Sequence, residues 1–70
     1  MIERTGQIWR SVYHDEIFLI LRSWASVFED KWIMHEVLTL YSEKPKRQIH
    51  DFSEQEAGYW EESCIMDRLL

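Results

Sequence analysis

Residues 16–23 read EIFLILRS and decide the fold class of this chain. Five consecutive residues in this stretch are apolar. In a strand the side chains alternate between two faces, so Leu19 projects opposite to Phe18, Ile20 and the stem of Arg22. Both faces are therefore apolar, and such a strand is usually covered on both sides of its sheet. The stretch predicts the central strand of a small closed or nearly closed sheet, with Leu19 in the core.

Further strands are predicted on both sides of the central strand. Residues 5–12 alternate in polarity, and the turn residues 13–15 join them to the central strand as an antiparallel hairpin. Farther along, the run VLTLYS-EKPK-RQIHDF at 37–52 is typical of a second hairpin, because its proline fixes one backbone angle of the turn.

The last third of the chain predicts a short helical turn and one more strand. Ser53-x-x-Glu56 matches a helix capping box, and Gly58 follows so soon that only one turn is expected. Residues 63–70 alternate imperfectly and are expected to close the sheet as its last strand.

Residues 27–42 admit two interpretations. Ser26-x-x-Glu29 also matches a capping box, and an amphipathic helix could follow it. Alternatively, residues 31–42 form a long strand. We favour the strand, because it leads directly into the predicted second hairpin. The alternative fold class is α+β with an amphipathic helix at about 27–42.

This order of elements resembles that of small SH3-like barrels, in which a helical turn commonly precedes the last strand. The predicted fold is therefore all-β, a five-stranded SH3-like barrel with one helical turn, formed as a single domain by residues 1–70. The opening GQIWR followed by EIFLIL also resembles the first hairpin of the MazF-type ribonuclease toxins. The acidic balance of the chain argues against RNA cleavage, and no site residue follows from either resemblance.

Charge and cysteine content narrow the function. The net charge is −5, and residues 48–70 hold six acidic side chains and one basic one. Only Lys44, Lys46 and Arg47 cluster as bases, so direct nucleic-acid binding is not expected. No apolar run could span a membrane, the N-terminus carries no signal peptide, and the lone Cys64 can form no internal disulfide. We therefore expect a cytoplasmic protein.

No motif predicts a chemistry. His14, His35, His50 and Cys64 lack the spacing of common zinc motifs. A lone cysteine, Cys64, beside Ile65 is typically a small buried hydrophobe and not a nucleophile. We expect no catalytic residue, no metal and no cofactor.

The aromatic residues are the best candidates for function. Trp and Tyr are enriched in binding hot spots, and acidic neighbours favour a basic partner. The alternative is that these aromatics cover the open ends of the barrel. The candidate partner-binding residues, in predicted loops and turns, are Trp24, Phe28, Tyr59, Trp60, Glu61 and Glu62.

We therefore predict a non-enzymatic acidic module that binds another protein, in one version a phage or mobile-element inhibitor of a nucleic-acid-binding host protein. In that version the acids of residues 51–67 would imitate phosphates. One alternative is a small barrel enzyme or ribonuclease-type toxin. Another is the subunit of a homo-oligomer, in which the aromatics are buried between copies.

Overall fold

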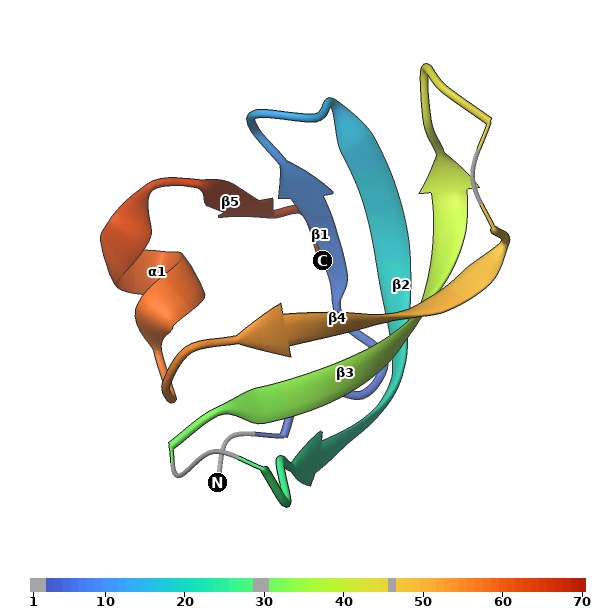
Figure 1. Cartoon of the computed structure of the whole chain (residues 1–70). Coiled ribbons are helices and arrows are strands. Elements are labelled where there is room, and N and C mark those ends of the chain that lie inside the picture. The colour runs from blue at the N-terminus through green and yellow to red at the C-terminus, as the bar shows by residue number, and fades with distance from the viewer. Residues whose placement is uncertain (1–2, 29–30, 46) are drawn as a thin grey trace.

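The computed structural model describes residues 3–28, 31–45 and 47–70 and shows a mainly β protein (Figure 1). The elements are β1 (Ile8–Ser11), β2 (Glu16–Ala25), β3 (Ile33–Tyr41), β4 (Ile49–Glu54), α1 (Tyr59–Ser63) and β5 (Met66–Arg68). The all-β class, the five strands and the short helix before the last strand were all predicted from the sequence.

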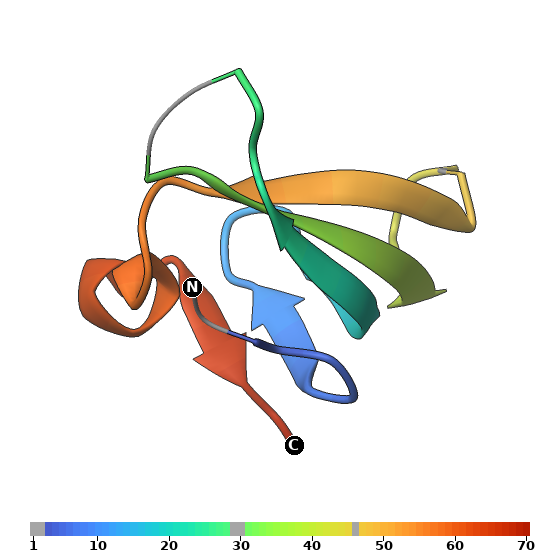
Figure 2. The same cartoon turned by 90° about the horizontal axis from the view of Figure 1, so that it is seen from below.

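The five strands form one antiparallel sheet in the order β4-β3-β2-β1-β5. Among the described residues, β4 and β5 are the two edges and do not pair with each other, so the sheet is curved but not closed. The predicted barrel closure is therefore not present. Figure 2 shows the curvature, with β4 along the top of the view, β3 beside it, and β1 and β5 below. Strand β5 has only three residues, and α1 lies next to it between the two edges (Figure 1).

Strand β2 has its core on one face only. Phe18 and Ile20 are each 1% exposed, whereas Leu19 is half-buried on the outer face. The prediction of Leu19 as a core residue was wrong. Cross-strand pairing places Leu19 beside Ile8 and Leu38, so its face is a row of apolar residues that no second layer of the described residues covers.

A bulge in β2 also reverses the predicted alternation. The register with β3 shifts between Ile20 and Arg22, and Ser23 then pairs with His35 on the core face. Arg22 consequently lies exposed on the outer face. One extra residue in a strand exchanges the two faces beyond it, which simple alternation could not predict.

The strand interpretation of residues 31–42 is confirmed by β3. Ile33 and Val37 are buried at period-two spacing, as expected for a strand with one covered face. The predicted Ser26 capping box involves Glu29, which lies outside the described residues. The Ser26 hydroxyl accepts a hydrogen bond from the Phe28 N–H at 3.2 Å, in a loop.

The second capping box was wrong. Ser53 belongs to β4, and α1 begins only after Gly58, whose φ of 86° suits glycine. The helix ends at Ser63, and its C-cap residue Cys64 has a φ of 60° and is exposed, so the expectation of a buried cysteine was also wrong.

The core is largely aromatic. Trp60, from α1, packs in edge-to-face geometry against Trp9 at 5.2 Å and Phe52 at 5.7 Å between ring centroids. Phe18 stacks on Phe52 at 5.2 Å. One tryptophan from a five-residue helix thus fills the space under the curved sheet.

Candidate functional site

A polar network runs through the core beside these aromatic rings. Its members are Arg4, Ser23, His35, Glu54 and Glu61, which come from the N-terminal segment, β2, β3, β4 and α1 respectively. Buried charges are costly unless they are paired and hydrogen-bonded, so the geometry of each pair matters.

Arg4 lies at the centre of this network and is 2% exposed. Its Nε and Nη2 donate to the two carboxylate oxygens of Glu54 at 2.8 and 2.6 Å, a bidentate pair. Nη2 also donates to Glu61 at 2.5 Å. The guanidinium carbon lies 4.7 Å from the ring centroids of both Trp9 and Trp60. Arg4 is thus held by two carboxylates and two indole rings.

His35 connects Glu54 to Ser23. Its Nε2 lies 3.0 Å from Glu54 Oε1, and its Nδ1 lies 2.7 Å from Ser23 Oγ. An ionised carboxylate only accepts hydrogen bonds, so we assign the proton to Nε2, and the Ser23 hydroxyl can donate to Nδ1.

The order serine, histidine, carboxylate matches that of a nucleophilic triad. However, His35 is 0% exposed, and Arg4 already holds both oxygens of Glu54. The surface hollows described below also lie away from Ser23. We therefore interpret the array as a network that orders the core.

The charges of the network support this interpretation. Burial alone would raise the pKa of Glu54, but hydrogen bonds from Arg4 and His35 outweigh burial and lower this pKa to about 2. For Arg4, burial acts to lower the pKa, and the two glutamates outweigh it and raise this pKa above its usual value. Both groups are therefore charged across the physiological range.

The sequence did not predict this cluster. Arg4 and Glu54 are 50 positions apart, and neither lies in a recognisable motif. The only local signal was His35 between apolar residues of a predicted strand, because a buried histidine needs polar partners.

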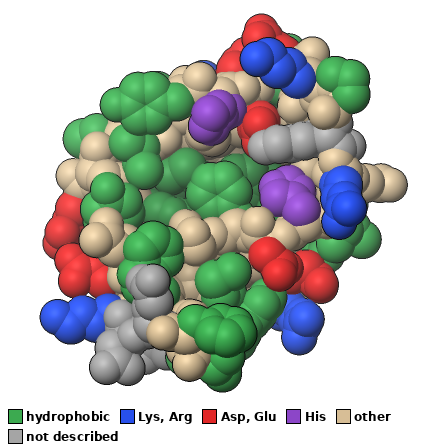
Figure 3. Space-filling view, in the orientation of Figure 1, with side chains coloured by type: hydrophobic (Ala, Val, Ile, Leu, Met, Phe, Trp, Pro, Cys, Tyr) green, Lys and Arg blue, Asp and Glu red, His purple; other side chains and the backbone are tan. Residues whose placement is uncertain are grey.

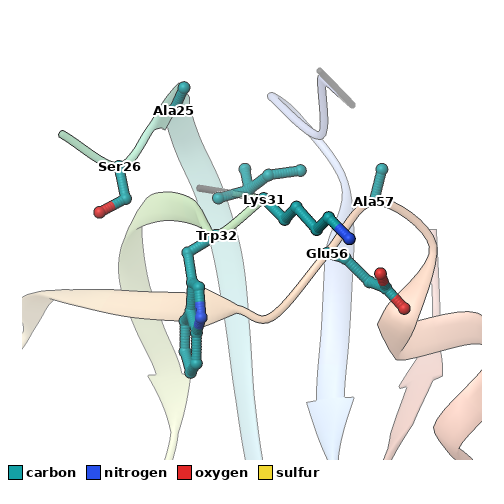
Figure 4. Close-up of a pocket in the computed structure, with 7 residues that line it drawn as sticks. Ala25, Ser26, Lys31, Trp32, Glu56 and Ala57 are labelled. Carbon is teal, nitrogen blue, oxygen red and sulfur yellow. The ribbon is translucent and has the colours of Figure 1, made fainter. Parts of the chain in front are cut away.

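A hollow of about 460 Å³ opens where the β2–β3 connection meets the segment after β4. In Figure 4, Lys31 extends across this hollow toward Glu56, while the Trp32 ring points away from both along one side. Its remaining lining residues are Ala25, Ser26, Ile33 and Ala57. This hollow therefore has one acidic and one basic group near an aromatic wall.

Another hollow, of about 240 Å³, shares Ser26 and Trp32 with the first. It is lined by Phe28, Trp32 and Met34 together with two serines, Ser26 and Ser53. Phe28 is 92% exposed, and the adjacent Val27 is 87% exposed. In Figure 3, hydrophobic side chains reach the lower end of the molecule, where the connection between β2 and β3 lies. We call the five lining residues, Ser26, Phe28, Trp32, Met34 and Ser53, the aromatic hollow.

The predicted partner-binding residues lie in two parts of the fold. Trp24, at the end of β2, is half-buried with the Arg22 guanidinium 4.6 Å from its ring centroid, and Phe28 lines the aromatic hollow. The other four lie on α1. Of these, Trp60 is 1% exposed and Tyr59 packs partly against the core, while Glu61 binds Arg4 and Glu62 is exposed. Trp60 is therefore a core residue and does not form part of the exposed surface.

No protein-family model matches the chain, and no curated protein and no solved structure matches it significantly. Within residues 3–28, 31–45 and 47–70, no group of three or more His, Cys, Asp or Glu side chains is arranged to hold a metal ion. The only helix described there is far too short to cross a membrane.

Proposed function

We propose that this domain is a non-enzymatic module that binds a basic protein segment through the aromatic hollow. The observation that carries the proposal is the exposure of Phe28 and Val27 next to an apolar depression lined by Trp32 and Met34. Large apolar side chains such as Phe28 supply contact area in protein interfaces, where aromatic residues are enriched.

The charge around the hollow favours a basic partner. Asp51 lies two residues before Ser53 on the same face of β4, and Glu56 lines the neighbouring hollow. Both carboxylates are exposed. Together with the net charge of −5, they would attract a partner that carries lysine or arginine beside an apolar side chain.

The version in which acids imitate phosphates receives less support. Three of the six acids in residues 48–70 are paired within the chain: Glu54 and Glu61 with Arg4, and Asp67 with Arg10. A phosphate mimic needs a row of unpaired carboxylates, so we propose general protein binding with electrostatic steering.

The test compares two exposed aromatics. A partner is captured from the source cells, purified, and titrated against wild type, Phe28→Ser and Tyr13→Ser. Tyr13 is 78% exposed in the turn between β1 and β2 and serves as the matched control. We expect Phe28→Ser to stay folded and lose about 2 kcal/mol or more of binding free energy, with Tyr13→Ser unchanged. Equal affinity of Phe28→Ser, Trp32→Ala and wild type would exclude this surface.

A homo-oligomeric role is a second candidate, favoured by the outer face of the sheet. Ile8, Leu19, Leu38 and Ile49 pair in one row across four strands, and Ile49 is 53% exposed. Sedimentation equilibrium tests this role: a dimer that Ile49→Lys converts to monomer would support it, and a monomeric wild type would exclude it.

A further inference from the structure

The surroundings of Arg4 form a complete recognition site for a guanidinium group. Trp9 and Trp60 each approach its guanidinium carbon, Glu54 binds it in bidentate geometry, and Glu61 binds it from the solvent side. The Glu61 side chain is 47% exposed, whereas the Glu54 side chain is 0% exposed. We call Trp9, Glu54, Trp60 and Glu61 the guanidinium cage.

Outside the cage, Arg4 is held mainly by a turn with Gln7: its carbonyl oxygen accepts from the Gln7 N–H at 2.9 Å, and its Nη1 donates to Gln7 Oε1 at 3.3 Å. Its own backbone N–H lies 3.4 Å from Ser23 Oγ, at the long limit of a hydrogen bond. Thr5 and Gly6 are exposed, and the next backbone bonds to the sheet join Gly6 and Gln7 to Ile20. A rotation before Gly6 would withdraw Arg4 by breaking these two contacts with Gln7, while the hydrogen bonds between the strands would remain.

We propose that the guanidinium cage binds an arginine side chain of a second polypeptide in exchange for Arg4. The exchange conserves charge and every hydrogen-bond donor, so the cage contacts are equal before and after it. Which arginine occupies the cage then depends on two quantities. One is the effective concentration of Arg4, which is on the order of millimolar for a short flexible tether. The other is the number of further contacts that the incoming segment makes. Lysine cannot replace arginine, because it lacks the planar fork that both carboxylates require.

This site is independent of the aromatic hollow. Its residues come from β1, β4 and α1, and none of them lines either hollow around Trp32. The ligand class is a guanidinium side chain, carried either by residues 3–8 of another copy or by an unrelated partner.

The first experiment empties the cage. Thermal unfolding and tryptophan fluorescence of Arg4→Ala are followed in low-millimolar guanidinium chloride, with sodium chloride at equal ionic strength as the salt control. We expect the unfolding temperature to lie below that of wild type and to rise saturably with guanidinium, together with a change in fluorescence from the two indoles.

Arg22→Ala is the matched variant, because Arg22 also lies over a tryptophan and is paired with Glu36 at 3.4 Å, but at an exposed site. It should show no rescue. If Arg4→Ala is unfolded without ligand, guanidinium should restore its folded circular dichroism spectrum. A response of Arg4→Ala no larger than its response to sodium chloride would overturn the proposal.

The second experiment supplies the arginine on a peptide. Three peptides are titrated into Arg4→Ala, Arg4→Lys and wild type: ERTGQI from residues 3–8, its lysine counterpart EKTGQI, and the unrelated GGRGG. We expect Arg4→Ala to bind ERTGQI most tightly, Arg4→Lys less tightly and wild type least. We expect Arg4→Ala to bind EKTGQI at least about tenfold more weakly than it binds ERTGQI.

The peptides also separate the two sources of the arginine. Preference for ERTGQI over GGRGG would identify another copy of this chain, whereas equal affinity would identify any arginine-bearing partner. Equal binding of ERTGQI to all three proteins, or binding to none, would overturn the proposal.

Discussion

At the scale of single residues, Glu54 has the largest influence on the described core. Its carboxylate meets Arg4 on one side and His35 on the other, and it is 0% exposed. Removing one partner of such a pair leaves a buried charge without compensation, which is far more costly than the pair is stabilising. The network therefore makes the fold sensitive to pH.

The pH dependence follows from the lowered pKa of Glu54. Its pKa is about 2 in the folded protein and 4.5 in the reference state, so the folded protein is stabilised above pH 4.5 and loses this contribution as the pH falls toward 2. The contribution is about 3 kcal/mol. Urea unfolding from pH 7 to pH 2 should show this loss.

Glu54→Gln removes the titrating group. The free energy of unfolding of this variant should be lower at pH 7 and should change less between pH 4.5 and pH 2 than that of wild type. Asp67→Asn is the control, since its pair with Arg10 is exposed and such pairs contribute little. If Glu54→Gln lost as much stability as wild type between pH 4.5 and pH 2, the lowered pKa of Glu54 would be contradicted.

Adjacent residues of β2 provide a second prediction. Ile20→Ala should cost about 2–5 kcal/mol, because it leaves a cavity in the core. Leu19→Ala should cost only about 1 kcal/mol, because Leu19 is half-buried on the outer face. Chemical denaturation of both variants measures the difference. A larger loss for Leu19→Ala would mean that the outer face is covered in solution, most simply by another copy of the chain.

At the scale of elements, α1 depends on a single side chain. The helix has five residues and no side-chain cap at its N-terminus, so it is not stable by itself. Trp60 attaches it to the core through contacts with Trp9, Phe18 and Phe52. Glu61, which binds Arg4, ties α1 to the N-terminal segment.

Trp60→Ala should therefore lower stability by about 3–5 kcal/mol and sharply reduce the unfolding temperature. Glu62→Ala, on the exposed side of the same helix, should stay within about 0.5 kcal/mol of wild type. Calorimetry of the two variants provides the comparison. A stable Trp60→Ala protein would show that the indole is dispensable to the core.

At the scale of the whole molecule, the distribution of charge disfavours nucleic acid as a direct ligand. Arg4, Arg10 and Arg22 are all paired with carboxylates of the chain. A gel-shift titration with mixed DNA and RNA at low salt should show no complex in the micromolar range. Tight binding that is lost on charge reversal of Lys44 and Arg47 would contradict this prediction.

The sequence by itself determined the strand content. Apolar runs and turn residues are local signals, so β2, the second hairpin and the short helix before the last strand could be read from neighbouring residues. Alternation alone could not determine which face of β2 meets the core. That depends on the bulge after Ile20 and on where α1 packs, and both are set by contacts between distant segments.

The candidate sites show the same division. The sequence identified Phe28 as a candidate, because a large aromatic in a predicted loop is a local signal. Only the tertiary structure removed Trp60 from the surface and brought Arg4 to Glu54 across 50 positions. A bidentate ion pair between residues this far apart has no sequence periodicity. It forms because the curved sheet and α1 enclose a space in which a buried carboxylate needs a cation.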